Sequence, residues 1–268
     1  MIPTVPGFVD AWLSASAAVF AAMTVVWLVS LVLDDVSIVD VFWGPAYLLA
    51  VAVAWVVGPT SGWALPTIGL VGLWSIRLGV HLAPRVAEPE DRRYAEMRES
   101  AGSAFRWTSL VKVFWLQAGL VAVFSSPLVA AVVVDGSPGP TAFAAAAVAM
   151  GGLVFEAVAD RQLTTFRNDP DSDGRVLNTG LWRYSRHPNY FGEAVVWWGF
   201  GAWCALALGT PLPLLVSVLM TGLLVRVSGI PLMEPHLEST RPGYAEYARR
   251  TSAFIPLPPR AGTSSDDE

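Results

Sequence analysis

Residues 10–33 read DAWLSASAAVFAAMTVVWLVSLVL and carry a single charged side chain, that of Asp10. A helix that crosses the hydrocarbon core of a bilayer needs about 20 consecutive, mostly apolar residues. The run meets this length. It also exceeds the apolar core of a secretory signal peptide, and the basic residues that precede such a core are missing here. We therefore predict a transmembrane helix over residues 10–33 that remains in the mature protein.

Six further apolar runs follow the first one along the chain. The composition agrees with them, because 54% of the 268 residues are hydrophobic and 15% are charged, whereas soluble domains carry about a quarter charged residues. The predicted fold class is an all-α, polytopic membrane protein with about seven transmembrane helices in one bundle. The expected spans are residues 10–33, 39–57, 62–83, 110–134, 141–160, 191–209 and 211–230.

The distribution of Lys and Arg predicts how these helices are oriented. The segments expected on one side of the membrane are 1–9, 58–61, 135–140 and 209–211, and none of them contains a Lys or Arg. All 17 basic residues fall toward the other side, which the positive-inside rule assigns to the cytoplasm. We expect a multi-pass protein of the cytoplasmic membrane, in contact with the lipid bilayer, with its N-terminus outside and its C-terminus in the cytoplasm.

Composition also excludes several classes of function. The net charge of −5 comes partly from the acidic residues 266–268 and gives no sign of nucleic-acid binding. The single cysteine, Cys204, lies in an apolar run, so we expect neither a disulfide framework nor a metal site. Residues 1–257 are predicted to form one transmembrane domain, and residues 258–268 a disordered tail.

Charged and aromatic side chains gather between the predicted spans. Residues 77–98 have the composition of a basic loop that docks on anionic lipid headgroups. Glu156 and Asp160 are four residues apart and hence lie on one face of a helix. Ionisable groups at membrane depth usually face a partner or an aqueous cavity. Alternatively, both carboxylates simply pair with nearby arginines at the interface.

A third segment, residues 177–193, reads LNTGLWRYSRHPNYFGE. It unites arginines, an imidazole, amides and a carboxylate at the start of a predicted span. This set suits an aromatic, polyanionic ligand, because arginines bind phosphates and amides bind polar ring and ribose groups. An interfacial aromatic belt would use some of the same residue types.

Three short sequences within the C-terminal half carry a family resemblance: GLW (180–182), RHPNYFGE (186–193) and YAEYARRTSAFIP (244–256). They resemble the C-terminal signature of the membrane steroid 5α-reductases and sterol reductases, and the whole chain resembles the DUF1295 branch of that superfamily. Isoprenylcysteine carboxyl methyltransferases share a related Arg-His-Pro-x-Tyr-x-Gly core. The resemblance is most specific over residues 156–257.

The resemblance implies a bundle of seven transmembrane helices with a cofactor pocket open to the cytosol, which in the reductases holds NADPH. It also implies a lipid-side cavity for a hydrophobic, steroid- or isoprenoid-like substrate. Carried over position by position, the cofactor-binding residues that it implies are Glu156, Asp160, Arg167, Arg175, Arg186, His187, Asn189, Tyr190, Glu193, Trp197, Tyr247 and Arg250.

The chain departs from the reductases where their proton donor lies. Trp74 stands at the position that we align with their catalytic Tyr, and their Gln-Glu pair in the second span is missing. Asp40 and Tyr47 are then the candidate catalytic proton donors, since a half-buried carboxyl group can have its pKa raised toward the working pH. Alternatively, Asp40 only caps its helix.

Three functions remain open. The first is NADPH-dependent hydride transfer to a double bond of a hydrophobic, lipid-dissolved substrate, and the pair of Glu156 and Asp160 favours it. The second is a membrane methyltransferase that uses S-adenosylmethionine. Those enzymes usually carry a Glu-Glu pair near the last span, where this chain has Glu234 alone. The third is a lipid-binding or scaffold protein that keeps the fold without the chemistry.

The predicted topology can be tested with reporter fusions. Reporters joined at Gly136 and at Ala261 should report opposite compartments, because the basic residues lie toward only one of the two sides. Activity of both reporters in the same compartment would contradict the seven-span topology.

Overall fold

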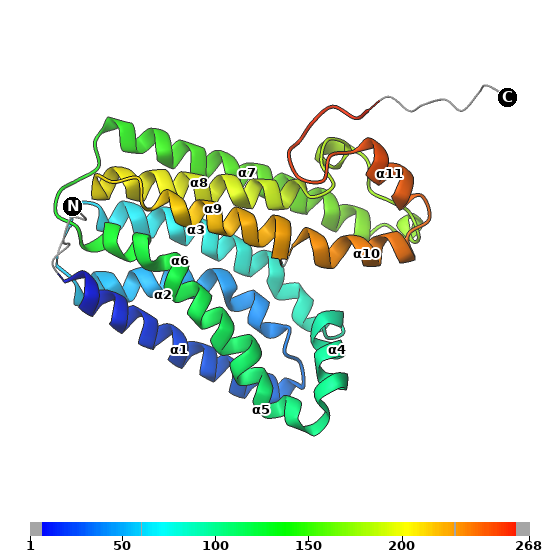
Figure 1. Cartoon of the computed structure of the whole chain (residues 1–268), viewed down its shortest axis with the longest axis horizontal. Helices are drawn as coiled ribbons and strands as arrows, with labels where there is room; N and C mark the ends of the chain where they lie inside the picture. Colours follow the sequence, from blue (N-terminus) through cyan, green and yellow to red (C-terminus); the bar gives the residue numbers. More distant parts are fainter. Residues whose placement is uncertain (1–6, 60, 228, 261–268) are drawn as a thin grey trace. The chain divides into compact units, whose positions relative to one another are not determined.

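The computed structural model describes residues 7–59, 61–227 and 229–260. Within these residues the chain forms helices, turns and one isolated bridge between Ser185 and Ser252, and no strand (Figure 1). The all-α prediction is confirmed. The helices are α1 (Phe8–Leu33), α2 (Ile38–Val57), α3 (Ala64–Leu82), α4 (Arg92–Ala101), α5 (Phe105–Ser109), α6 (Leu116–Val133), α7 (Pro140–Arg167), α8 (Pro188–Leu208), α9 (Leu214–Gly222), α10 (Ile230–Thr240) and α11 (Tyr244–Arg250).

Seven helical stretches of the described chain are long and apolar enough to cross a membrane, as predicted. Several of them continue past the apolar run that predicted them. A π-helical segment, Leu110–Trp115, joins α5 to α6, and another, Leu223–Val227, follows α9. Helix α7 reaches Arg167 and stops just before Asp169-Pro170. Helix α7 ends there because the residue before a proline disfavours helical backbone.

Contacts group the chain into two compact units, residues 1–142 with 204–210 and residues 143–203 with 211–268. In the first unit α1, α2, α3 and α6 pack against one another. The indole N–H of Trp12 donates a 2.8 Å hydrogen bond to the carbonyl of Ala122 and so links α1 to α6. Trp12 is half-buried, and the main-chain acceptor satisfies its one hydrogen-bond donor.

In the second unit, glycines allow α7 and α8 to approach closely. A Cβ atom on Gly152 would lie 2.6 Å from the amide nitrogen of Val196, and one on Gly192 would lie 2.6 Å from that of Glu156. Ser217 extends the packing to α9, since its hydroxyl donates a 2.7 Å hydrogen bond to a main-chain carbonyl of α8. The backbone contact brings the polar end of α7 beside the first turns of α8.

Two neighbouring glycines of α7 provide a matched test of this packing. Gly152→Ala should lower the free energy of unfolding by about 1–3 kcal/mol, because the new methyl group has no room against α8. Gly151→Ala is the control, since a Cβ atom there meets nothing within 4 Å. It should be neutral or slightly stabilising through helix propensity. Thermal unfolding in detergent measures both, and equal midpoints for the two variants would contradict the packing argument.

Candidate functional site

The motif loop, residues 177–187, is anchored to α7. Gln162 accepts a 2.9 Å hydrogen bond from the amide of Leu181, and the indole of Trp182 donates a 3.1 Å bond to a main-chain carbonyl of α7. Gly180 has a φ of +58°, and a Cβ atom there would lie 2.6 Å from the Gln162 side chain. Only glycine fits this turn without strain. The GLW sequence therefore holds the motif loop on α7.

The C-terminal strap, residues 251–260, lies along the motif loop. The amide of Arg186 donates to a strap carbonyl at 2.8 Å, and a strap amide donates to the carbonyl of Tyr184 at 2.9 Å. The hydroxyl of Tyr247, on α11, donates to two main-chain carbonyls of the motif loop. Burial raises the pKa of Tyr247 above its ordinary value, so the hydroxyl stays protonated and able to donate. Tyr247 thus positions the loop.

The strap extends further than the sequence predicted. Residues 258–260 were assigned to a disordered tail, but the amide of Arg260 donates a 2.9 Å hydrogen bond to the carbonyl of Arg250. These three residues belong to the strap because their backbone returns to the end of α11. The remainder of the predicted tail, residues 261–268, lies outside the described residues.

Five of the predicted site residues come together where α7 meets α8. Glu156, Asp160 and Glu193 expose only 3%, 4% and 8% of their surface. The Asn189 amide donates to Asp160 at 3.1 Å, and the Trp197 indole donates to Glu193 at 2.9 Å. Buried carboxylates at membrane depth are costly and are typical of functional sites. The arrangement offers carboxylate and amide groups in a setting largely closed to solvent.

Arg186 and His187 instead contact Glu234 on α10. The Arg186 Nε donates to Glu234 Oε1 at 2.7 Å, and His187 Nε2 lies 3.2 Å from the same oxygen. The Arg186 guanidinium also donates to two main-chain carbonyls near the end of α11, at 2.7 and 3.1 Å. Tyr190 stacks on His187 with ring centroids 5.4 Å apart. These contacts give Arg186 a mainly structural role as a link between the motif loop, α10 and α11.

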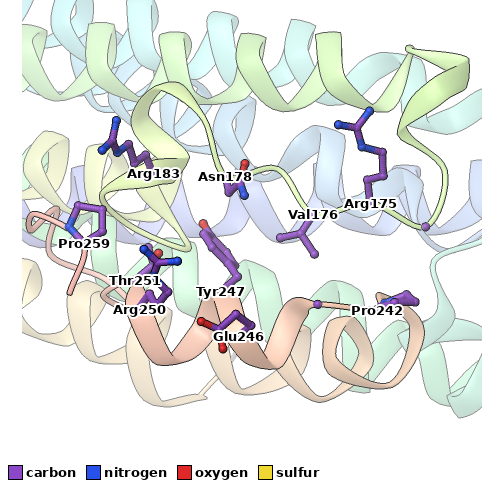
Figure 2. Close-up of a pocket in the computed structure, with 12 residues that line it drawn as sticks. Arg175, Val176, Asn178, Arg183, Pro242, Glu246, Tyr247, Arg250, Thr251 and Pro259 are labelled. Carbon is purple, nitrogen blue, oxygen red and sulfur yellow. The ribbon is translucent and has the colours of Figure 1, made fainter. Parts of the chain in front are cut away.

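A cavity of about 660 Å³ opens between the motif loop and α11. In Figure 2 Tyr247 extends from α11 toward the loop that carries Asn178. Among the residues that the structure describes, the guanidinium groups of Arg183 and Arg250 have no hydrogen-bond or ion-pair partner. Charged groups that line a cavity without a counter-ion favour an anionic ligand. The lining residues are Gly174, Arg175, Val176, Asn178, Arg183, Pro242, Gly243, Glu246, Tyr247, Arg250, Thr251 and Pro259.

The predicted cofactor residues are divided between these places. Arg175, Tyr247 and Arg250 line the cavity, whereas Arg167 is exposed at the end of α7 and does not line it. Sequence reasoning missed Arg183 and Asn178 as lining residues. Both lie in the polar segment 177–193, so their chemistry was visible in the sequence. Whether these two side chains reach the cavity depends on the short 3₁₀ turn at the GLW sequence. Residue spacing alone did not predict that turn.

Asp40, one predicted proton donor, lies in the first unit and joins α2 to α4. Its carboxylate accepts hydrogen bonds from the Arg93 guanidinium at 3.0 Å and from the Tyr94 hydroxyl at 2.8 Å. Arg93 also pairs with Asp91, which precedes α4. Burial alone would raise the pKa of Asp91, but hydrogen bonds from the side chain and backbone of Arg93 lower it below its ordinary value. Asp40 therefore belongs to a charged network at the helix ends.

The alternative structural role of Asp40, as a helix cap, is not the one observed. The N-terminal cap position of α2 is Ser37, and no side chain caps the helix. Tyr47, the second predicted donor, is fully buried. Its ring packs edge-on against Trp43 and Trp74, with centroids 5.4 and 5.5 Å away. Trp74 thus contributes to the aromatic core around Tyr47.

Comparison with known proteins identifies the family. The family model described as "Protein of unknown function (DUF1295)" matches residues 26–251. The chain belongs to the DUF1295 family. Neither the curated proteins nor the solved structures include a match. In this DUF1295 chain the matched range contains the motif loop and α11, whereas the strap from residue 252 onward lies beyond it.

The charged network of the DUF1295 chain predicts that Asp40 contributes to stability. Asp40→Asn should lower the free energy of unfolding by about 1–2 kcal/mol. The amide is neutral and cannot form the ion pair with Arg93, and its NH₂ group is a hydrogen-bond donor placed beside the donors of Arg93 and Tyr94. Asp10→Asn is the control, since Asp10 is exposed in the first turn of α1. Thermal unfolding in detergent compares the two. A midpoint for Asp40→Asn as high as that of the control would show that these contacts contribute nothing.

Proposed function

We propose that the protein is a membrane-embedded, NADPH-dependent reductase that transfers a hydride to a double bond of a hydrophobic, steroid- or isoprenoid-like lipid. The observation that carries this proposal is the cavity lined by Arg175, Arg183 and Arg250. Its charge suits phosphate groups, because guanidinium groups bind them in a bidentate, charge-assisted manner. The seven apolar helices support a lipid-dissolved substrate.

The residues present fit such a cofactor. Arg175, Arg183 and Arg250 would hold its phosphates, and Asn178 would bind a polar group beside them. The amide of Asn189 and the carboxylate of Glu193 would receive polar groups of the nucleotide at the α7–α8 contact. Bound NADPH supplies the hydride, while the protein supplies binding and orientation.

A reduced double bond also needs a proton. Because the chain departs from the reductases at their proton donor, Asp40 and Tyr47 are the proposed donors. The Asp40 carboxylate accepts hydrogen bonds from Arg93 and Tyr94 and so belongs to a charged network. Tyr47 carries a phenolic hydroxyl, which can donate a proton. Tyr47 is therefore the donor to test first, by measuring turnover of Tyr47→Phe.

One contact favours a second function, the methyltransferase that uses S-adenosylmethionine. Glu234 contacts both Arg186 and His187, the two residues that open the Arg-His-Pro core shared with those enzymes. A single glutamate can therefore engage that core here. Ligand stabilisation separates the two functions, because a ligand that binds only the folded state raises its stability.

The proposed function predicts that NADPH raises the unfolding temperature of the detergent-solubilised protein and that S-adenosylmethionine does not. Arg183→Gln should weaken NADPH binding about tenfold, since it removes one charge-assisted contact to a phosphate. Arg106→Gln is the control, because Arg106 is exposed on α5 in the first unit and lines neither cavity.

Stabilisation by S-adenosylmethionine alone would replace the reductase with the methyltransferase. If Arg183→Gln bound NADPH as tightly as the wild type, this arginine would have no part in cofactor binding.

A further inference from the structure

A second cavity, of about 290 Å³, lies between the strap and the end of α11. Three arginines line it, from three segments: Arg186 from the motif loop, Arg250 from α11 and Arg260 from the strap. The other lining residues are Ala248, Thr251, Ser252, Ala253, Leu257 and Pro258. Apart from the three arginines, the side chains that line this cavity are uncharged, and most of them are small.

The charges of this second cavity are only partly balanced. Arg186 is neutralised by Glu234 and held by main-chain carbonyls. Arg250 and Arg260 are exposed to solvent, and over residues 7–260, apart from the two positions not described, their guanidinium groups have no acidic partner. Two uncompensated positive charges match a phosphate monoester, which carries a charge of about −1.5 to −2 at pH 7.

Arg250 and Thr251 line both cavities, so the two are adjacent. Adjacent cationic cavities suit one ligand with two separate phosphate groups. NADPH is such a ligand, because it carries a 2′-phosphate on its adenosine ribose besides the diphosphate. The element that closes the second cavity, from Ser252 to Arg260, lies beyond the range matched by the family model. The cavity is therefore formed jointly by residues inside that range, such as Arg186 and Arg250, and by residues beyond it, such as Arg260.

We propose that the second cavity binds a phosphate monoester through Arg250 and Arg260. If the proposed function holds, this phosphate monoester is the 2′-phosphate of NADPH. Arg260 is then the residue that selects NADPH over NADH. Arg250 serves both cavities and contributes to the binding of either dinucleotide. Arg260 lines only the second cavity and acts on the 2′-phosphate alone.

The test uses matched ligand pairs that differ by the 2′-phosphate alone. Isothermal titration of the full chain in detergent compares adenosine 2′,5′-bisphosphate with AMP, and NADPH with NADH. Arg260→Gln should lower the affinity for the bisphosphate and for NADPH about tenfold, because one charge-assisted contact is lost. The affinities for AMP and NADH should stay within about twofold of the wild-type values. Arg260→Lys should lower these first two affinities by less than Arg260→Gln does, since lysine keeps a positive point charge. Arg106→Gln is the control and should leave all four affinities unchanged, because Arg106 lines neither cavity.

The outcomes separate this inference from the proposed function. Equal affinity of the wild type for NADPH and NADH would overturn the inference and leave the reductase standing. Binding of inorganic phosphate that depends on Arg260, with no binding of either dinucleotide, would support the phosphate site and overturn the reductase. Loss of phosphate binding in Arg106→Gln as well as in Arg260→Gln would overturn the inference, because a general surface charge would then explain the binding.

Discussion

A bilayer core offers no hydrogen-bond partner to a peptide group, and this constraint underlies the architecture of the protein. Each segment that crosses the core must satisfy its own backbone, so the described spans are helices. Charged side chains are costly in the same core. Much of the polar chemistry of the chain therefore lies in the motif loop, α11 and the strap, while the carboxylates of Glu156, Asp160 and Glu193 are buried within α7 and α8.

Helix packing in a membrane depends on close contact, because lipid and leucine are equally apolar. The glycines of α7 and α8 provide that contact and bring their backbones together at Gly152 and Gly192. The close approach also positions chemistry. It places the buried carboxylates of α7 beside Asn189 and Glu193 of α8. The same feature thus stabilises the second unit and shapes its polar interior.

The two cavities differ from this buried polar region, because several of the arginines that line them have no acidic partner among the described residues. In Arg186 a glutamate and main-chain carbonyls satisfy a half-buried guanidinium. Arg183, Arg250 and Arg260 are exposed to solvent and have no such partners among the described residues. Their positive charges are therefore accessible around the two adjacent cavities. The strap completes this arrangement by adding Arg260.

Hydropathy and residue type were sufficient to predict the seven spans and the all-α class, because every span must be apolar along its own length. They also identified the motif around Arg186 and the pair of Glu156 and Asp160, whose spacing places both on one helical face. Only the tertiary structure separated arginines that have side-chain partners from those that have none. Arg186 and Arg183 are three residues apart in the segment 177–193. Arg186 is held by Glu234, whereas Arg183 lines the larger cavity without a partner among the described residues. That difference depends on contacts with α10, α11 and the strap, which lie far along the chain and leave no local pattern in the sequence.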